Sequence, residues 1–197
     1  MINKKSLSFL LSFYVFSIQG FCKVFFRPRD KIKDALIQLI KEERKSIDVA
    51  MYMFTDKTIA QELIDAYVRG VKVRAVLDQA SMGERYGKGV FLRNNGVTVV
   101  EHVAPNPKAF SLPIMHHKFF IFGQNIVTGS DLLWTGSYNC TAAASTMHDE
   151  NALLTDDASA ILEYKQCFLS LISRLSPERS FSEDEDSKGG WSGQGIA

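Results

Sequence analysis

Three short segments in the second half of the chain combine side chains that phosphoryl transfer needs. They are His116-His117-Lys118, Gly136-Ser137-Tyr138-Asn139 and His148-Asp149-Glu150-Asn151. A histidine can supply a nucleophile, while ammonium, amide and hydroxyl groups can stabilise charge that develops on phosphate oxygens. Taken singly, each segment is more often structural, because a lone histidine is commonly a packing residue and Gly-Ser-x-Asn is commonly a turn. The three segments therefore carry an argument only together.

Taken together, these segments resemble the HxK and GSxN motifs of the phospholipase D superfamily. The similarity covers residues 115–122, 136–139 and 150–154, and residues 45–56 and 69–78 resemble the corresponding stretches of small single-motif members. It is greatest to the short bacterial endonucleases and to the mitochondrial cardiolipin-hydrolase or piRNA-nuclease branch. The resemblance implies a phosphoric diester hydrolase that works without a metal or any other cofactor.

His116 is the predicted nucleophile. An imidazole with a pKa of about 6.5 is substantially neutral at pH 7, so it can attack phosphorus and form a phosphohistidine that water then hydrolyses. Lys118 lies two residues further on, and strand residues alternate between faces, so both side chains are expected on one face. The Lys118 ammonium is predicted to bind the non-bridging oxygens. His117 is expected to point the other way, as a structural or rim residue.

Three further residues take their roles from the resemblance. Asn139 is expected to be catalytic, and its amide and the hydroxyl of Ser137 are expected to bind phosphate oxygens together with Lys118. Glu150 is expected to accept a hydrogen bond from the far nitrogen of His116, which would fix the tautomer and stabilise the imidazolium that develops. Judged from the residues alone, Glu150 would be a solvent-exposed carboxylate at the start of a strand.

A single motif supplies one nucleophile and leaves the departing alkoxide without an acid. Two-motif relatives have a second copy in the same chain, whereas this sequence shows no internal repeat. The resemblance therefore implies a homodimer in which two copies of His116 face one shared active site, one attacking and one donating a proton. A symmetric two-fold interface is the simplest such assembly.

A metal site is the rival explanation for clustered histidine and acidic residues. The adjacent pair His116-His117, with Glu150 far downstream, matches neither the zinc-binding helix motif nor a cysteine knuckle. We expect no metal. His148 receives no role, and His102 is expected at the surface or at the rim of the site.

Two departures from the family pattern lie between Lys118 and Gly136. The usual motif places an aspartate five residues after the lysine, where this chain has Gly123. That aspartate is generally structural, so its absence is expected to affect local packing more than activity. Residues 125–135 also form a longer connection than in the compact bacterial nucleases, and a hairpin with Ser130-Asp131 at its tip is expected.

The hydrophobic pattern predicts one α/β domain. Strands are expected near residues 24–26, 46–54, 71–77, 97–101, 117–122, 125–128 and 151–154, and helices near 32–40, 59–68, 90–94 and 161–172. Thr55-Asp56 is typical of a helix start, and Gly70 is typical of a helix end. We predict a mixed, mostly parallel β-sheet with helices on both faces, as in the phospholipase D-like fold.

The predicted domain organisation has three parts. A signal peptide or N-terminal anchor occupies residues 1–22, the catalytic domain residues 23–175, and a disordered acidic tail with glycine and serine residues 176–197. Lys4 and Lys5 precede an uncharged apolar run that is shorter than the roughly 20 residues of a membrane-spanning helix. The protein is therefore expected to be exported, into the periplasm or the medium, with membrane anchoring as the alternative. Cys140 and Cys167 either pair or are separate buried thiols.

The substrate stays open between two classes of phosphodiester. A net charge of +1 permits an anionic substrate without requiring one. A basic groove would favour a non-specific endonuclease acting on DNA or RNA, and its candidates are Arg27, Arg29, Arg85, Lys88, Arg93 and Lys108. An apolar lip with peripheral membrane contact would favour hydrolysis of phosphatidylcholine or cardiolipin, and its candidates are Phe110, Leu112, Pro113, Leu132, Leu133 and Trp134. A third alternative, prompted by Gly123, is a degenerate binding protein without activity.

Overall fold

The computed structural model describes residues 20–83, 85–104, 113–126 and 128–176. The rest of the predicted leader, the acidic tail beyond residue 176, and Lys108, Phe110 and Leu112 lie outside the described residues.

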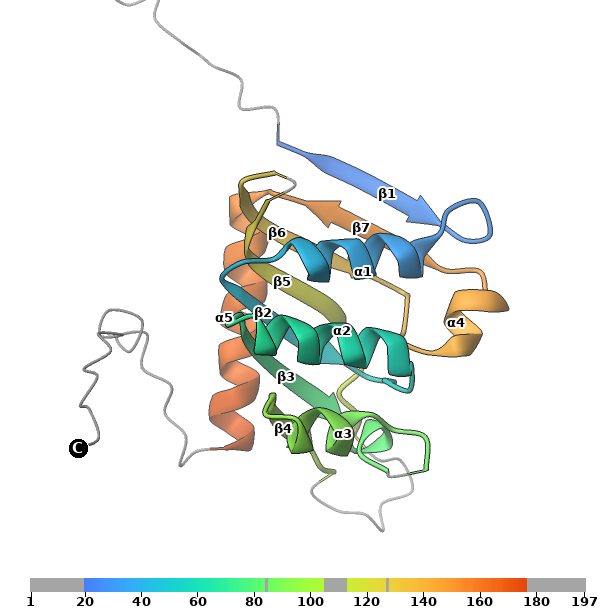
Figure 1. Cartoon of the computed structure of the whole chain (residues 1–197), viewed down its shortest axis with the longest axis vertical. Coiled ribbons are helices and arrows are strands. Elements are labelled where there is room, and N and C mark those ends of the chain that lie inside the picture. Colours follow the sequence, from blue (N-terminus) through green and yellow to red (C-terminus); the bar gives the residue numbers. More distant parts are fainter. Residues whose placement is uncertain (1–19, 84, 105–112, 127, 177–197) are drawn as a thin grey trace, which may run out of the picture.

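A seven-stranded sheet forms the centre of the domain, in the order β1-β7-β6-β5-β2-β3-β4 (Figure 1). The strands are β1 (Cys22–Phe26), β2 (Ser46–Met51), β3 (Lys72–Asp78), β4 (Thr98–His102), β5 (Lys118–Asn125), β6 (Ser130–Gly136) and β7 (Asn151–Thr155). Most interior strand positions are apolar and buried, so both faces of the sheet need a cover.

Helices cover the two faces unequally. On one face lie α1 (Ile32–Glu42), α2 (Lys57–Val68) and α3 (Gly89–Asn94), and on the other lies the long α5 (Ala158–Leu175) (Figure 1). The short helices η1 (Gln79–Ser81) and α4 (Ala142–Thr146) lie in connections. The predicted mixed α/β class with helices on both faces is confirmed.

The strand directions differ from the prediction of a mostly parallel sheet. Only β2–β3 and β3–β4 are parallel neighbours, and the other four neighbouring pairs are antiparallel. The β-α-β order of the first half does produce strands of one direction, but β5, β6 and β7 lie between β1 and β2. Sequence order alone gave no sign of this insertion.

The connection after β5 also differs in detail. A strand near residues 125–128 was predicted, with a hairpin tip at Ser130-Asp131. Instead β5 continues to Asn125, and β6 begins at Ser130. The hairpin exists, but its turn lies near Gly129, whose φ of 71° favours glycine.

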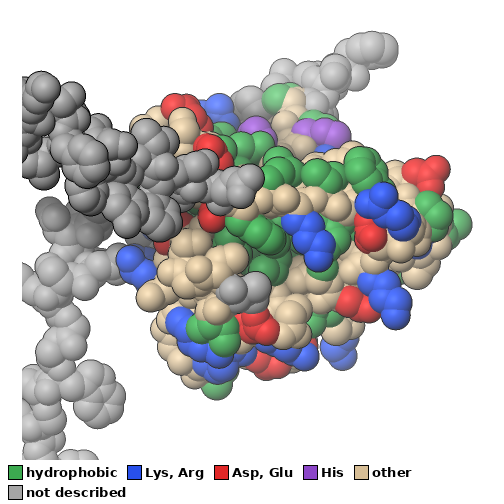
Figure 2. Space-filling view, turned by 90° about the horizontal axis from the view of Figure 1, so that it is seen from above, with side chains coloured by type: hydrophobic (Ala, Val, Ile, Leu, Met, Phe, Trp, Pro, Cys, Tyr) green, Lys and Arg blue, Asp and Glu red, His purple; other side chains and the backbone are tan. Residues whose placement is uncertain are grey.

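The edge strand β1 presents apolar side chains to solvent. Figure 2 looks down on this edge and shows hydrophobic side chains gathered along it; Val24 is 43% exposed and Phe26 49%. Cationic groups lie over nearby rings, with Lys23 Nζ 4.8 Å from the centre of Phe25 and the Arg29 guanidinium 5.6 Å from that of Phe26. Charges along an edge strand oppose pairing with a further strand.

The cysteines are free, and their positions argue against pairing. Cys140 is fully buried in the core beneath α1 and α2, whereas Cys167 packs against the core beneath α5. The sheet lies between these two cores. Burial raises the pKa of the Cys140 thiol, so it behaves as an inert apolar side chain.

The predicted domain boundary between residues 22 and 23 falls inside β1, which starts at Cys22. Just before it, Phe21 N donates to Asp156 Oδ1 at 2.5 Å, and Asp156 N donates to Phe21 O at 3.1 Å. Within the described part of the chain, no helix is both long and apolar enough to cross a bilayer.

Candidate active site

The three motif segments meet at one end of the central strands, where β2 and β6 end and β5 and β7 begin. Strand β5 starts there at Lys118, which lies beside Met51 at the end of β2. At the same edge β6 ends at Gly136, opposite Ala152 near the start of β7. Antiparallel pairing therefore gathers the HxK, GSxN and Glu150 segments although 34 residues separate His116 from Glu150 in sequence.

His116 and Lys118 form a contacting pair, as predicted. Lys118 Nζ lies 3.2 Å from His116 Nε2 and donates to the backbone oxygen of His116 at 2.9 Å. An ammonium has no acceptor, so this contact suits the tautomer whose lone pair is on Nε2. Burial lowers the pKa of Lys118, and the nearby Glu150 carboxylate partly opposes that shift. The imidazole itself is exposed, so an incoming phosphate can reach Nε2.

Tyr52, which carries no catalytic role in the sequence prediction, is part of the site. Its ring lies edge-on to His116 with 4.6 Å between ring centres, and Lys118 Nζ lies 5.4 Å from the Tyr52 ring centre. Its backbone N–H donates to His117 O at 2.9 Å. Tyr52 therefore holds the motif through both its ring and its backbone. Its place directly after β2 was the available signal.

Asn139 is oriented for the role assigned to it. Its Oδ1 accepts from Met53 N at 3.2 Å, just beyond the end of β2. With the oxygen engaged, the amide N–H groups are the ones left to donate to a phosphate oxygen.

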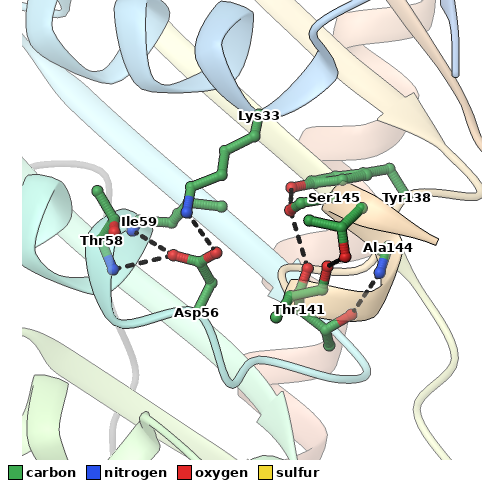
Figure 3. Close-up of polar contacts among 10 residues, drawn as sticks. Lys33, Asp56, Thr58, Ile59, Tyr138, Thr141, Ala144 and Ser145 are labelled. Carbon is green, nitrogen blue, oxygen red and sulfur yellow. Dashed lines mark hydrogen bonds and ion pairs between the residues drawn. The ribbon is translucent and has the colours of Figure 1, made fainter. Parts of the chain in front are cut away.

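Polar contacts of Tyr138, Thr141 and Ser145 fix the loop that carries Asn139 (Figure 3). Tyr138 is 2% exposed, and its hydroxyl lies 2.7 Å from Ser145 Oγ, which donates to Thr141 O at 2.9 Å. Thr141 Oγ1 in turn accepts from Ala144 N at the start of α4. Burial is the main cause that raises the pKa of Tyr138 far above its usual value, so it stays a neutral hydrogen-bonding group.

A second contact in Figure 3 ties two helices to this loop. Asp56 caps α2 by accepting from Thr58 N and Ile59 N, and its other oxygen binds Lys33 Nζ of α1 at 2.7 Å. The backbone N–H of Asp56 donates to Cys140 O at 2.9 Å. The helix start predicted at Thr55-Asp56 is confirmed, and it also supports the GSxN loop.

Glu150 does not make the predicted hydrogen bond with His116. Its Oε2 accepts from Ser137 Oγ, and Ser137 Oγ accepts from Asn151 N at 3.0 Å. The single hydroxyl proton of Ser137 is thus given to Glu150 rather than held ready for a phosphate. Ser137 is fixed beside Glu150, because its backbone N–H donates to Asn151 O at 3.2 Å next to the β6–β7 pair. Glu150 still lies close enough to influence Lys118.

Arg27, a candidate for the basic groove, is used structurally. Its Nε donates to His148 O at 2.8 Å and its Nη1 to Ser145 O at 2.9 Å. Its backbone N–H donates to Glu150 O at 2.9 Å. The residue that follows β1 therefore holds the approach to Glu150, and His148 contributes through its backbone.

His117 lies on the α5 face, as predicted from strand alternation. Its ring contacts Phe119 with 5.7 Å between centres, and its Nε2 lies 3.9 Å from Cys167 Sγ on α5. Burial, followed by the positive charge of Lys118, lowers the pKa of His117. The residue is nevertheless exposed, so these contacts fit the structural or rim role expected for it.

A glutamate from another element supplies a carboxylate next to Gly123. Glu43 is fully buried, and its Oε1 accepts from Lys45 N, Ser46 N and Gln124 N at 2.8, 3.1 and 2.8 Å. A Cβ on Gly123 would collide with Ser46 Oγ. The missing motif aspartate thus leaves no packing defect, because Ser46 and Glu43 fill the position.

Among the described residues, no group of three or more His, Cys, Asp or Glu side chains is placed to hold a metal ion. At the same ends of the strands the site offers an exposed imidazole in contact with an ammonium, and an amide anchored at Met53 just after β2. This set can attack a phosphodiester and stabilise the charge on its oxygens.

The family model described as cardiolipin synthase, PLD-like domain, matches residues 36–172. The chain belongs to the phospholipase D superfamily. The matched region contains the HxK and GSxN segments and Glu150, so the resemblance noted in the sequence is confirmed.

Curated relatives within the superfamily have two kinds of name. The chain is 29% identical over 145 residues to phospholipase D from Rickettsia prowazekii, covering 74% of this chain and 64% of the relative. It is 28% identical over 151 residues to mitochondrial cardiolipin hydrolase from Xenopus tropicalis, covering 75% and 64%. The match thus spans slightly less than two thirds of each relative.

Solved structures show the same fold. NucT from Helicobacter pylori superposes with a TM-score of 0.68 at 22% identity, over 78% of this chain and 96% of that one. Nuc from Salmonella typhimurium, a phospholipase D family member, superposes with a TM-score of 0.63 at 24% identity, over 77% and 93%.

Proposed function

We propose that this protein is a metal-independent phosphodiesterase that forms a phosphohistidine at His116, and that its substrate is DNA or RNA. The contact of His116 Nε2 with Lys118 Nζ at 3.2 Å, on an exposed sheet edge, is the observation that carries the proposal. The imidazole can attack phosphorus, and the ammonium is close enough to bind an oxygen of the same phosphate group.

The reaction follows from these groups in two displacements. The lone pair of His116 Nε2 attacks phosphorus while the bond to the leaving oxygen breaks, and that oxygen takes a proton from a second imidazolium. Lys118 and the Asn139 amide stabilise the equatorial oxygens. The second imidazole then removes a proton from water, whose oxygen attacks phosphorus and releases His116.

The second imidazole is assigned to His116 of another copy of the chain. His117 cannot supply it, because its ring lies on the α5 face beside Cys167. His148 is exposed, and its hydrogen bonds are made by its backbone, to Arg27 Nε and to Ala143 O. A homodimer with a shared site supplies the acid without a further residue.

Nucleic acid is preferred because of a groove that carries two lysines. This groove of about 440 Å³ between α2 and α3 is lined by Lys57, Gly87, Lys88, Val90, Phe91 and Asn94. Lys88 N donates to Phe54 O at 2.9 Å, so the wall of the groove is tied to the chain two residues after Tyr52. Two lysines with no carboxylate in the lining suit a phosphate backbone.

An aromatic and a cationic side chain stand on the loop before this groove. Tyr86 is 63% exposed, and the Arg85 guanidinium lies 5.0 Å from its ring centre. Exposed aromatic rings next to cations are a common platform for unpaired bases. Of the other predicted groove residues, Arg29 pairs with Asp30 at 2.9 Å and Arg93 approaches Glu101 at 3.9 Å.

The predicted apolar lip is largely wrong. Leu132, Leu133 and Trp134 belong to β6 and are at most 2% exposed, so they cannot touch a bilayer. Pro113 is exposed, and Ile114 beside it is 46% exposed.

Lipid hydrolysis remains the second candidate, because Ile114 lies two residues before His116 and relatives are named phospholipase D and cardiolipin hydrolase. Export, with the N-terminal segment as a signal or an anchor, stays a proposal that rests on the leader-like sequence.

The deciding experiment compares substrates side by side. The purified full chain is incubated in chelator with plasmid DNA, single-stranded RNA, cardiolipin and phosphatidylcholine, and His116→Asn serves as the matched control. Cleavage of nucleic acid that the variant lacks supports the proposal, and lipid turnover with nucleic acid untouched would replace it by the second candidate. A folded dimer inactive on every substrate would establish a binding protein.

A further inference from the structure

One buried carboxylate outside the motifs holds the backbone that carries the nucleophile. Asp78 ends β3 and is 1% exposed. Its Oδ2 accepts from Met115 N at 2.9 Å, and its Oδ1 accepts from Ala80 N at 3.0 Å. Met115 directly precedes His116 and is itself buried, so the first of these hydrogen bonds fixes the chain one residue before the predicted nucleophile.

The second hydrogen bond, from Ala80 N, acts on His116 indirectly, through η1 and Tyr52. Ala80 belongs to η1, and the last residue of η1, Ser81, is fully buried. Ser81 Oγ donates to Tyr52 O at 2.7 Å and accepts from Phe54 N at 2.8 Å. The Tyr52 ring packs against the His116 imidazole. Asp78 therefore supports both the backbone before His116 and the ring beside it.

Asp78 also joins the two ends of the connection between β4 and β5. His102, the last residue of β4, is 9% exposed, and its Nδ1 lies 3.3 Å from Asp78 Oδ2. Met115, near the start of β5, binds the same oxygen. His102 is thus not the surface residue that the sequence suggested; it packs against the carboxylate that anchors the nucleophile segment.

Few hydrogen bonds fix the nucleophile segment. Residues 113–117 belong to no helix or strand, and β5 begins only at Lys118. Within the described residues, the polar anchors of residues 115–117 are Asp78, Tyr52, Lys118 and the α5 contact of His117, while the Met115 side chain packs in the core beneath α5. A buried carboxylate accepting a backbone N–H gives a strong, directional bond. Its loss would let His116 Nε2 move relative to the phosphate-binding groups.

We propose that Asp78 is a positioning residue for His116: it sets the place and orientation of the nucleophile without touching substrate. This inference rests on the proposed function for its kinetic consequence, though not for its structural one. A displacement of about 1 Å at a reacting atom can cost on the order of 100-fold in rate. The effect should fall on kcat, because Lys118 and Asn139, which bind phosphate, have their own anchors.

The variant Asp78→Asn tests the proposal with the least change in shape. Asparagine has one acceptor where aspartate has two, so either Met115 N or Ala80 N loses its partner. Asp48→Asn is the matched control, since Asp48 is a 6% exposed carboxylate on the neighbouring β2, bound to Arg74 by two 2.7 Å contacts, and faces α5 rather than the site.

Three readouts apply to both variants: kcat and KM on the substrate that wild type cleaves, thermal unfolding, and amide hydrogen exchange of residues 113–118. For Asp78→Asn we expect kcat to fall about 10- to 100-fold with KM changed less than threefold, and exchange in residues 113–118 to accelerate. For Asp48→Asn we expect a lower unfolding temperature with kcat and local exchange unchanged.

Wild-type kcat in folded Asp78→Asn would overturn the proposal. So would an equal fall in kcat for Asp48→Asn, since that indicates general destabilisation. The exchange measurement separates this proposal from the proposed function: faster exchange at 113–118 in a protein that cleaves no phosphodiester would leave Asp78 as the anchor and remove the phosphodiesterase. Unchanged exchange at residues 113–118 in an active enzyme would keep the phosphodiesterase and remove Asp78 as the anchor.

Discussion

The two ends of strand β5 place polar side chains in opposite surroundings. At its start, His116 and Lys118 are accessible to solvent, and Lys118 Nζ lies 3.2 Å from His116 Nε2. At its end, the Glu43 carboxylate is fully buried and accepts three backbone N–H groups from Lys45, Ser46 and Gln124. One end leaves its polar groups accessible to a ligand, and at the other end Glu43 Oε1 is used within the fold.

This difference explains how the chain can lack a motif residue and keep its site. The motif aspartate would lie at Gly123, at the buried end, where a carboxylate can only support the backbone. Glu43 provides that support from the connection after α1. The exposed end has no such substitute, because the nucleophile and its cation must occupy fixed positions relative to substrate. Substitutions at the two ends should therefore fail in different ways.

The largest expected effect is loss of activity in His116→Asn. Removing a nucleophile should reduce kcat by at least about 1,000-fold, because among the described residues His116 is the imidazole that contacts Lys118 Nζ. Thermal unfolding should be unchanged, since the ring is exposed. Hydrolysis and a melting curve on the same sample check both. Residual activity above one tenth would place the nucleophile elsewhere.

The second-largest effect is expected for Glu43→Ala, which should lose stability without direct damage to the site. Three partly buried backbone N–H groups lose their acceptor, which should lower the free energy of unfolding by about 3 kcal/mol. Urea denaturation measures the change, with Glu42→Ala, at a partly exposed neighbouring position, as the control. The folded fraction of Glu43→Ala should retain wild-type kcat. A larger loss of kcat than of stability would show that the two ends of β5 are coupled.

A smaller effect concerns pH and Lys118. Burial lowers the pKa of Lys118, and a phosphate needs its protonated form, so kcat/KM should fall as pH rises through a value below the ordinary lysine pKa of about 10.4. In Lys118→Arg the charge persists beyond pH 12, so this alkaline fall should disappear, while kcat/KM at pH 7 drops about 10-fold from poorer fit. An identical alkaline limb in both proteins would assign it to another group.

The smallest effect is expected for His117→Gln. The ring points to α5, so kcat should stay within about twofold of wild type, as for a change worth less than about 0.5 kcal/mol. Assays of His117→Gln and His116→Asn in parallel compare two adjacent histidines that lie on opposite faces of the sheet. A loss comparable with that of His116→Asn would contradict the assignment of faces.

Much of the scaffold was predictable because its signals are local. The apolar spacing of α1, α2 and α5 and the cap at Asp56 appear within a few neighbouring residues, as does the alternation that separates His116 from His117. These features depend on the periodicity of a helix or a strand, which the sequence shows directly.

The features that were missed depend on distant contacts. The place of β1 beside β7 follows from pairing across more than 120 residues, and the contact of Glu150 with Ser137 joins residues 13 positions apart. Glu43 lies outside the stretches that resemble the family, and Tyr52 and Asp78 lie within them but received no role. For the two acids, nothing in the neighbouring sequence distinguishes a buried acceptor from a solvated carboxylate.

The segment that follows the predicted leader also has a consequence for proteolysis. Strand β1 pairs along β7 with Phe26 opposite Asn151, and Arg27 secures the carbonyls of Ser145, His148 and Glu150. Cleavage ahead of Phe21 would leave this support whole. Cleavage after Arg27 would release the segment before Glu150 although every motif residue remained on the chain. The intact edge strand is therefore needed to support Glu150, so a cut within β1 would weaken a segment that lies more than 120 residues further along the chain.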